Sequence, residues 1–262
     1  MTILVYEHPL SPYAQKVKIA LDEKGVEYET KMPAAIGSGE PDVDFLRANP
    51  RGEVPALIDG DVTIFDSTII LEYIEAKWPE PGLLSREPAA AAHSRMIEEI
   101  MDTHFEPINW GMGEIRWFKR AGGERARTLE ASASTQARGL YVWLTRQLGE
   151  KEWFGDSKFG WADLSVVPYL NGARGNGIGP DERSPLGQWL KRANERPSVQ
   201  KAASAAMASL QGMTDVAGAV QSGRFKREYR DHRLEWMIRS GGIEVVIEGI
   251  QNNNIRFSNE LS

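Results

Sequence analysis

The alternation of strand and helix signals stops near residue 80 of this 262-residue chain, and this change constrains the fold more than any other feature. Before it, short β-branched and aromatic runs alternate with stretches of helical spacing. From Ala89 to about Met207, helical periodicity dominates and strand signals are almost missing. The run WPEPG at 78–82 breaks the pattern between the two parts. We therefore predict a small α/β domain followed by an all-α domain.

The first 80 residues predict a βαβ unit followed by a ββα unit. Strands are expected at Ile3–Tyr6, Val26–Met32, Ala56–Ile58 and Val62–Phe65. Ser11 followed by Pro12 is typical of a helix N-cap with proline at the first helical position. Asp59-Gly60 is a hairpin turn signal between the last two strands. This order predicts one domain built on a mixed sheet.

The residues after about 221 form a separate segment. If residues 222–239 are helical, one face carries Phe225, Tyr229, His232 and Trp236. That face is too apolar for a solvated helix, so we expect it to pack on the helical domain. Residues 243–247 alternate apolar and acidic side chains, which predicts a short extended stretch. The expected organisation is therefore 1–80, 89–220 and an extension at 221–262.

The composition excludes several classes of site and partner. The chain has no cysteine, which rules out disulfides, a protein thiol nucleophile and cysteine-ligated metals. Its net charge of −6 disfavours nucleic acid and anionic membranes as partners. The N-terminus lacks a signal-peptide pattern, and no apolar run approaches the length of a membrane span. We expect a cytoplasmic protein.

Three motifs in the first 80 residues carry a family resemblance. They are SPYAQKV at 11–17, NPRGEVPAL at 49–57 and DSTIILEY at 66–73. WADL at 161–164 and ERP at 195–197 follow in the helical half. In this order and spacing, the set resembles the cytosolic glutathione transferase family, of the serine type and bacterial-like with a C-terminal extension. The resemblance covers about residues 1–210 and implies a thioredoxin-like N-terminal domain (1–80), a helical domain (89–220) with an electrophile pocket, and glutathione as co-substrate.

The resemblance assigns Ser11 as the residue that donates its hydroxyl to the glutathione thiolate. A free thiol has a pKa of about 8.5, so little of it is ionised at neutral pH. A helix N-terminus with a hydroxyl donor can stabilise the anion through oriented N–H groups and a charge-assisted hydrogen bond. The local sequence alone also fits a Ser11 that only caps its helix. Tyr6 and Tyr13 are rival donors, although Tyr6 lies in a strand and is expected in the core.

The resemblance also places glutathione along two further motifs. Val54-Pro55 is similar to the family's cis-proline step, which leaves the Val54 backbone free to pair with the cysteinyl residue. Asp66-Ser67 opens a helix whose N–H groups suit the γ-glutamyl carboxylate, while Asp66 can pair with the ligand's ammonium. Arg51 and Glu53 belong to the same expected binding set. Family members often carry glutamine where this chain has Glu53, so the contact made by Glu53 is left open.

The electrophile pocket is expected in the first long helices of the second domain. Trp110, Arg116 and Trp117, together with Tyr13, are the candidate lining residues. Each of these helix residues could instead belong to the core. We expect the tail from about Gln221 to pack over this pocket, with docking elsewhere for stability as the open alternative.

Two other features are predicted to be non-catalytic. Asp163 fits a structural helix-capping role, but Gly160 stands where the family usually has serine or threonine. Asp102, His104 and Glu106 superficially suggest a metal site, yet residues two apart face different sides of a helix. We therefore predict no metal.

The predicted activity is attack of the glutathione thiolate on a hydrophobic or aromatic electrophile, as in detoxification. Glutathione-dependent cleavage of aromatic ethers and peroxide reduction fit the same site. A reductase that forms a mixed disulfide through its own cysteine is excluded, because the chain has none. A non-catalytic glutathione-binding regulatory module remains open, because this fold also serves binding proteins. The resemblance further implies a homodimer.

Overall fold

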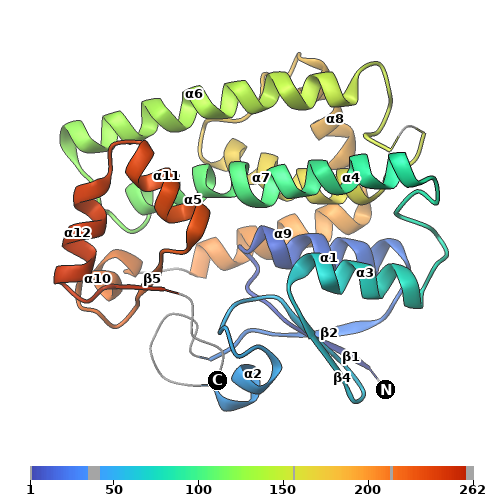
Figure 1. Ribbon diagram of the computed structural model, residues 1–262, viewed down its shortest axis with the longest axis horizontal. Helices are drawn as coiled ribbons and strands as arrows, with labels where there is room; N and C mark the ends of the chain where they lie inside the picture. Colours follow the sequence, from blue (N-terminus) through green and yellow to red (C-terminus); the bar gives the residue numbers. More distant parts are fainter. Residues whose placement is uncertain (1, 35–41, 156, 213–214, 258–262) are drawn as a thin grey trace.

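A computed structural model describes residues 2–34, 42–155, 157–212 and 215–257. It comprises a four-stranded sheet with its helices, a helical region above it, and a C-terminal segment folded back against that region (Figure 1). The expected change of architecture near residue 80 is confirmed. No helix within the described ranges is long and apolar enough to cross a membrane.

The sheet has the strand order β2-β1-β3-β4. Its strands are β1 (Ile3–Tyr6), β2 (Tyr28–Lys31), β3 (Ala56–Asp59) and β4 (Val62–Phe65). β1 pairs parallel with β2, in the register Ile3 with Tyr28, and antiparallel with β3. The β3–β4 hairpin turns at Gly60, whose φ of 62° suits glycine. The sheet is therefore mixed, as the element order predicts.

Helices cover both faces of this sheet (Figure 1). α1 (Pro12–Glu23) and α3 (Ser67–Lys77) pack together on the face toward the helical region. The short α2 (Val43–Ala48) covers the other face, where Tyr6 and Phe45 have ring centroids 5.3 Å apart. Tyr6 is thus buried in the core, as expected.

The helical region is centred on α7 (Trp161–Gly175), which is buried along most of its length. α7 packs against α1 and against α4 (Pro88–Ile100). A π-helical turn, η1 (Met101–Phe105), continues α4 into α5 (Glu106–Arg116). The remaining helices are α6 (Gly123–Leu148), α8 (Pro185–Ala193) and α9 (Pro197–Gly212). α9 joins the two parts of the molecule, because Arg196 at its start binds Glu23 of α1 with Nε and Oε1 2.9 Å apart.

Asp163 holds the start of α7 in place. Its carboxylate accepts hydrogen bonds from the backbone N–H groups of Phe154 and Gly160, at 3.0 and 3.1 Å, and from the Trp189 indole. Burial raises the pKa of Asp163 to about 6, although these donors oppose the shift. A Cβ at Gly160 would lie 2.6 Å from the Leu83 carbonyl oxygen, which explains why glycine replaces the family's serine or threonine.

The C-terminal segment departs from the sequence-based prediction. A single helix over 222–239 is wrong, because the chain forms α10 (Val216–Gln221), then β5 (Arg227–Glu228), and then α11 (Asp231–Arg239). The extended stretch expected at 243–247 is also wrong, because α12 (Ile243–Gln251) occupies it. The short β6 (Ile255–Arg256) pairs parallel with β5. This pairing and Gly223, with a φ of 72°, prevent a continuous helix.

The segment contacts α5 through its aromatic residues. Tyr229 and Trp236 are buried, and Phe225 is partly buried. The Tyr229 ring meets Trp110 of α5 edge-on, with centroids 4.7 Å apart. A Cβ at Gly111 would lie 2.1 Å from the Trp236 ring, so the indole rests directly on the α5 backbone.

Candidate active site

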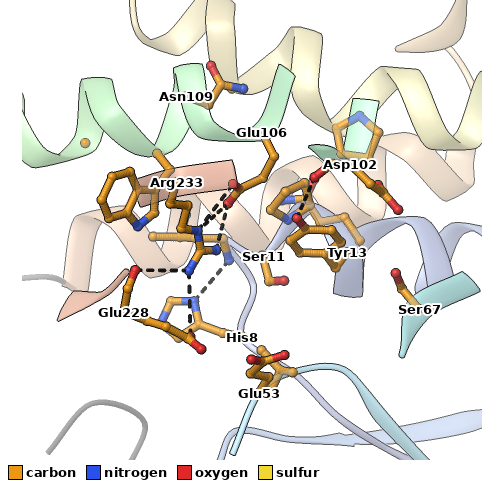
Figure 2. Close-up of a pocket in the computed structure, with 18 of the residues that line it drawn as sticks. His8, Ser11, Tyr13, Glu53, Ser67, Asp102, Glu106, Asn109, Glu228 and Arg233 are labelled. Atoms are coloured by element: carbon orange, nitrogen blue, oxygen red, sulfur yellow. Dashed lines mark hydrogen bonds and ion pairs between the residues drawn. The ribbon is translucent and has the colours of Figure 1, made fainter. Parts of the chain in front are cut away.

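A cavity of about 1460 Å³ lies between the sheet domain, the helical region and the C-terminal segment. Its wall includes every residue that the sequence assigns to glutathione: Ser11, Arg51, Glu53, Val54, Pro55, Asp66 and Ser67. Figure 2 shows Ser11 in the middle of this group, with Tyr13 on one side and the Glu106–Arg233 pair on the other. The cavity thus brings together residues from three separate parts of the chain.

Ser11 is the N-cap of α1. Its Oγ accepts a hydrogen bond from the Ala14 N–H at 3.3 Å, so the capping role is present. A hydroxyl that accepts from the backbone still has its own proton to donate. The first N–H groups of α1 have no partner within the helix, and they add a positive potential at the same place. Ser11 can therefore cap its helix and donate to an anion in the cavity.

The two other motifs lie in the same wall. The Val54-Pro55 peptide bond is cis, as the resemblance implies. Asp66 is the N-cap of α3, and its Oδ1 accepts from the Thr68 N–H at 3.0 Å. Its φ of 76° is a conformation that residues other than glycine rarely adopt and that is often found at ligand sites. Ser67 follows it at the first turn of α3 and lines the cavity.

The Tyr13 hydroxyl is already engaged. It donates to the backbone carbonyl of Asp102, within the π-helical turn, at 2.8 Å. His232 Nε2 lies 3.4 Å from the same tyrosine oxygen. Burial first, and then the charges of Glu106 and Asp102, hold the pKa of Tyr13 well above its usual value. Tyr13 is thereby less suited than Ser11 to stabilise a thiolate.

A buried ionic cluster lies behind Tyr13. Lys16 Nζ lies 2.5 Å from Glu98 Oε1 and 2.5 Å from Asp102 Oδ2. Asp102 Oδ1 also accepts from the Tyr169 hydroxyl at 2.7 Å. Burial raises the pKa of Asp102, and Lys16 opposes that shift. The cluster fixes α1 against α4 and the π-helical turn.

Glu106 anchors the C-terminal segment. Its Oε1 lies 2.7 Å from Nη2 of Arg233, and its Oε2 lies 3.0 Å from His232 Nε2. Burial would raise the pKa of Glu106, but the charge of Arg233 and the His232 contact outweigh it and lower the pKa to about 2. Glu106 is therefore an ionised structural anchor in the cavity wall.

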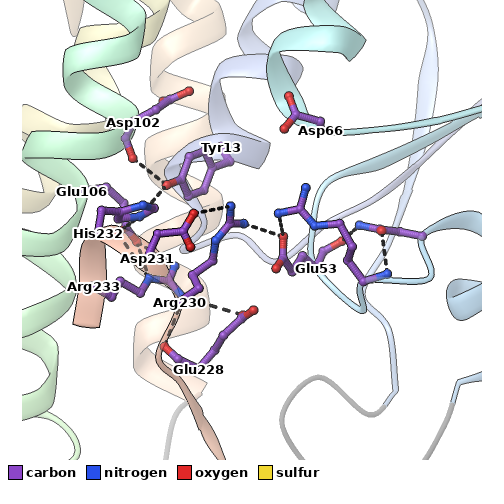
Figure 3. A network of polar contacts seen from close by, with 12 residues as sticks. Tyr13, Glu53, Asp66, Asp102, Glu106, Glu228, Arg230, Asp231, His232 and Arg233 are labelled. Carbon is purple, nitrogen blue, oxygen red and sulfur yellow. Dashed lines mark hydrogen bonds and ion pairs between the residues drawn. The ribbon is translucent and has the colours of Figure 1, made fainter. Parts of the chain in front are cut away.

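Glu53 joins the loop at 49–55 to the same segment. Its Oε2 lies 2.6 Å from Arg51 Nη2 and 2.7 Å from Arg230 Nη1 (Figure 3). Burial, and then the neighbouring Glu228 carboxyl, raise the pKa of Glu53, while the two arginines lower it. The contact left open by the change from glutamine to glutamate is thereby established: Glu53 holds two guanidinium groups.

The expected electrophile residues have different positions. Tyr13, Trp110 and Trp117 line the cavity, but Arg116 lies outside its wall. The Arg116 guanidinium instead lies 3.7 Å from Glu130, on an exposed part of α5 and α6. Phe118 adds an aromatic wall residue and stacks on Phe225 with centroids 5.9 Å apart.

The charged side chains of the C-terminal segment in this cavity were not predicted from the sequence, although the tail from about Gln221 was expected to pack over the electrophile pocket. Arg230 and Arg233 line the cavity together with His232, and only His232 belongs to the face that the sequence pattern singled out. A basic run of this kind is usually a solvated helix face, so no local signal identified it. Asp102 and Glu106 also share the cavity wall, but His104 does not. Within the described ranges, no group of three His, Asp or Glu side chains is placed to hold a metal ion.

Comparisons with known proteins agree with this architecture. The family model for the N-terminal domain of glutathione S-transferases matches residues 5–82. A glutathione S-transferase of Silene vulgaris is 31% identical over 214 residues, which cover 77% of this chain and 96% of that protein. Glutathione S-transferase GstB of Escherichia coli K12 is 28% identical, covering 73% of this chain and 92% of the relative.

Solved structures lead to the same family. The crystal structure of a glutathione S-transferase from Rhodospirillum rubrum F11 superposes with a TM-score of 0.66 at 27% identity. The superposition covers 77% of this chain and 91% of the Rhodospirillum rubrum chain. The sequence relatives, the thioredoxin-like sheet and the cavity between the two domains all agree. The chain belongs to the cytosolic glutathione S-transferase family.

Proposed function

We propose that this protein binds glutathione, favours ionisation of its thiol at Ser11 and adds the glutathione thiolate to a hydrophobic or aromatic electrophile. The observation that carries the proposal is the position of Ser11. It caps α1 in the wall of a cavity that also contains Val54-Pro55 and Asp66-Ser67. In this arrangement Ser67 and the start of α3 hold the γ-glutamyl carboxylate, and the Val54 backbone pairs with the cysteinyl residue.

The chemical role of Ser11 is electrostatic. Each pKa unit by which the thiol is lowered requires about 1.4 kcal/mol of preferential stabilisation of the thiolate. A hydroxyl donor and the N-terminus of a helix both favour the anion over the neutral thiol. The thiolate then forms a carbon–sulfur bond, while the electrophile releases a halide or an ether oxygen, or opens an epoxide. The serine keeps its own proton throughout.

The second half of the cavity suits an aromatic electrophile. Trp110 of α5, together with Trp117 and Phe118 just after that helix, supplies flat apolar surface, and Tyr13 lies at the junction with Ser11. Such walls favour ring stacking and exclude water from the reacting sulfur. Cleavage of an aromatic ether and reduction of a peroxide use the same thiolate, so the test has to separate them.

The test combines binding with three assays. Calorimetric titration with glutathione establishes binding, and difference absorbance of the bound thiolate gives the thiol pKa. Conjugation is then followed with a chlorinated nitrobenzene, ether cleavage with an aromatic ether, and peroxidase activity with an organic hydroperoxide. A lowered thiol pKa with conjugation supports the proposal. Binding with no turnover in any assay makes the protein a glutathione-binding module, and no binding removes the proposal.

We also propose that each part of the chain has its own function. Residues 1–80 bind glutathione, residues 89–220 form the electrophile side, and residues 221–262 are an extension that packs on the helical domain. Two such subunits form a homodimer, as expected from the family.

A further inference from the structure

The C-terminal segment crosses from the helical region to the glutathione-binding loop. Arg230 and Glu53 are 177 residues apart in sequence, yet Nη1 of Arg230 lies 2.7 Å from Oε2 of Glu53. In Figure 3, Arg230 extends from the start of α11 toward Glu53, with Asp66 of α3 farther along the same cavity. A residue outside the glutathione-binding motifs therefore reaches into their loop.

Glu53 pairs with more than one positively charged side chain. One carboxylate oxygen faces both Arg51 and Arg230, so the three side chains together carry an excess positive charge. Asp231 lies near Arg230, but its oxygen is 3.7 Å away and its side chain is 70% exposed, so water screens it. Glu228 also hydrogen-bonds to Glu53, and its carboxylate is at the same time 3.7 Å from Arg233 and 3.1 Å from Arg256.

Arg230 also has hydrogen-bond donors that Glu53 does not use. A guanidinium group has five N–H donors, and Glu53 takes one at Nη1. Its Nε is buried and has no hydrogen-bond partner among the described residues. A buried donor without a partner is costly, and it is an observation that indicates a missing acceptor. Arg230 lines the cavity and its side chain is 27% exposed, so the other N–H groups of the guanidinium can reach a ligand there.

Glutathione has a carboxylate for this position. In the proposed binding mode its γ-glutamyl end lies at Asp66-Ser67 and its cysteinyl residue at Val54. The glycyl residue is on the other side of the cysteine, which places its carboxylate toward the part of the loop that contains Glu53. We propose that Arg230, positioned by Glu53, binds the glycyl carboxylate of glutathione and so completes the glutathione site from the C-terminal segment; this inference rests on the proposed function.

In this assignment Glu53 is a positioning residue. A glutamine at the same place would offer the tripeptide a neutral donor and acceptor, whereas Glu53 cannot donate when ionised. A carboxylate facing the ligand's own carboxylate would repel it without the two arginines. Glu53 therefore loses a direct ligand contact and gains two cations, one of which comes from a separate segment.

The test uses a ligand that differs only at the glycyl carboxylate. Calorimetric titrations compare glutathione with its glycyl ethyl ester, which lacks that negative charge. The proteins are the wild type, Arg230→Met and Arg239→Met. Arg239 is the matched control, because it lies on the adjoining helix α11 but pairs with Glu235 on an exposed surface.

The expected result is a change in ligand preference. The wild type should bind glutathione at least about 10-fold more tightly than the ester, as charge-assisted hydrogen bonds predict. Arg230→Met should lose about 10-fold in affinity for glutathione and less than about twofold for the ester. Arg239→Met should match the wild type with both ligands. Arg230→Lys keeps the positive charge but loses the paired N–H donors of the guanidinium, so its preference for glutathione over the ester should be intermediate. This variant replaces Arg230→Met in the comparison if Arg230→Met does not fold.

The alternative outcomes separate two kinds of failure. If Arg230→Met, or Arg230→Lys in its place, weakens binding of both ligands equally or of neither, Arg230 has no role at the glycyl carboxylate while the proposed function stands. A wild-type protein that binds both ligands equally leads to the same conclusion. A wild-type protein that binds neither overturns this inference together with the proposed function.

Discussion

Lys16 Nζ lies 2.5 Å from Asp102 Oδ2, and the Lys16 side chain is fully buried. The same nitrogen is 2.5 Å from Glu98 Oε1, so one ammonium binds two carboxylates between α1 and the start of the helical region. Removing one member of a buried ion pair leaves uncompensated charge in a region of low dielectric constant.

Lys16→Met should therefore reduce the free energy of unfolding by about 3–5 kcal/mol at neutral pH. The deficit should shrink below pH 6, because burial already raises the pKa of Asp102 and protonation removes its charge. Lys77→Met is the control, since the Lys77–Asp59 pair is partly exposed and such pairs contribute little to stability. Urea unfolding at several pH values measures both. Equal effects of the two substitutions would contradict a stabilising role for the buried cluster.

Glu106 should make stability depend on acid pH. Its pKa is lowered from 4.5 to about 2, because Arg233 and His232 outweigh the effect of burial. The unfolded chain therefore takes up the proton first as the pH falls. The stabilisation is present above pH 4.5 and is lost between about pH 4.5 and 2, with a size of about 3 kcal/mol.

Glu106→Gln removes this titration. Unfolding free energies of the wild type should fall more steeply below pH 4.5 than those of Glu106→Gln. Glu235→Gln provides the control, because Glu235 pairs with Arg239 on the exposed face of α11. Parallel pH profiles for the wild type and Glu106→Gln would show that the ion pair with Arg233 does not form in solution.

Ser11→Ala should separate capping from thiol activation. Losing the hydrogen bond to the thiolate should raise the pKa of the bound thiol and slow conjugation about 10- to 100-fold at neutral pH. Loss of the cap should also cost about 1 kcal/mol of stability. Thiolate absorbance titrated against pH measures the first effect, and thermal melting measures the second.

Ser184→Ala is a matched control for that experiment. Ser184 caps α8, where its Oγ accepts from the Gly187 N–H at 3.0 Å, and it lies outside the cavity wall. It should lose similar stability and leave the thiol pKa unchanged. If Ser11→Ala behaves in the same way, Ser11 is a cap only, and another donor must ionise the thiol.

Gly111→Ala should destabilise the protein, although alanine normally favours a helix. A Cβ at Gly111 would lie 2.1 Å from the Trp236 ring, and it would force the C-terminal segment away from α5. We expect a loss of about 1–3 kcal/mol, as for other overpacked sites. Gly139→Ala on α6 meets nothing within 4 Å, and it should stabilise the helix by up to about 1 kcal/mol. If both substitutions changed the free energy of unfolding in the same direction, Trp236 would not pack against the α5 backbone at Gly111.

The oligomeric state is checked by sedimentation. We expect a species of twice the 29.2 kDa chain mass at micromolar concentration. A single species of the chain mass would remove the homodimer from the proposal.

Local rules predicted the N-terminal domain well and the C-terminal segment poorly. Ser11-Pro12 and Asp59-Gly60 specify their cap and turn through interactions within a few residues, so sequence reveals them. Residues 243–247 resemble a strand, but Val245 and Val246 are buried on one face of α12 and the helix is favoured by that packing. Tertiary contacts decided the fold of this segment.

The candidate site shows the same division. Ser11, Val54-Pro55 and Asp66-Ser67 were singled out through the family resemblance of their motifs, and the cis geometry of Val54-Pro55 came from that resemblance and not from the local sequence. The role of Arg230 could not be predicted, since it depends on a partner 177 residues away in sequence. The π-helical turn that presents the Asp102 carbonyl to Tyr13 has no distinctive composition either.

Three ion pairs join the sheet domain to the rest of the molecule at separate places. Glu23 binds Arg196 at the start of α9, Lys16 binds Glu98, and Glu53 binds Arg230. A hinge rotation about any one of them would stretch the other two. We therefore expect the two domains to move together, so that a substrate diffuses in through the mouth of the cavity without domain opening. Substrate range should then follow the width of that mouth, and turnover should depend on side-chain rearrangement and not on domain opening.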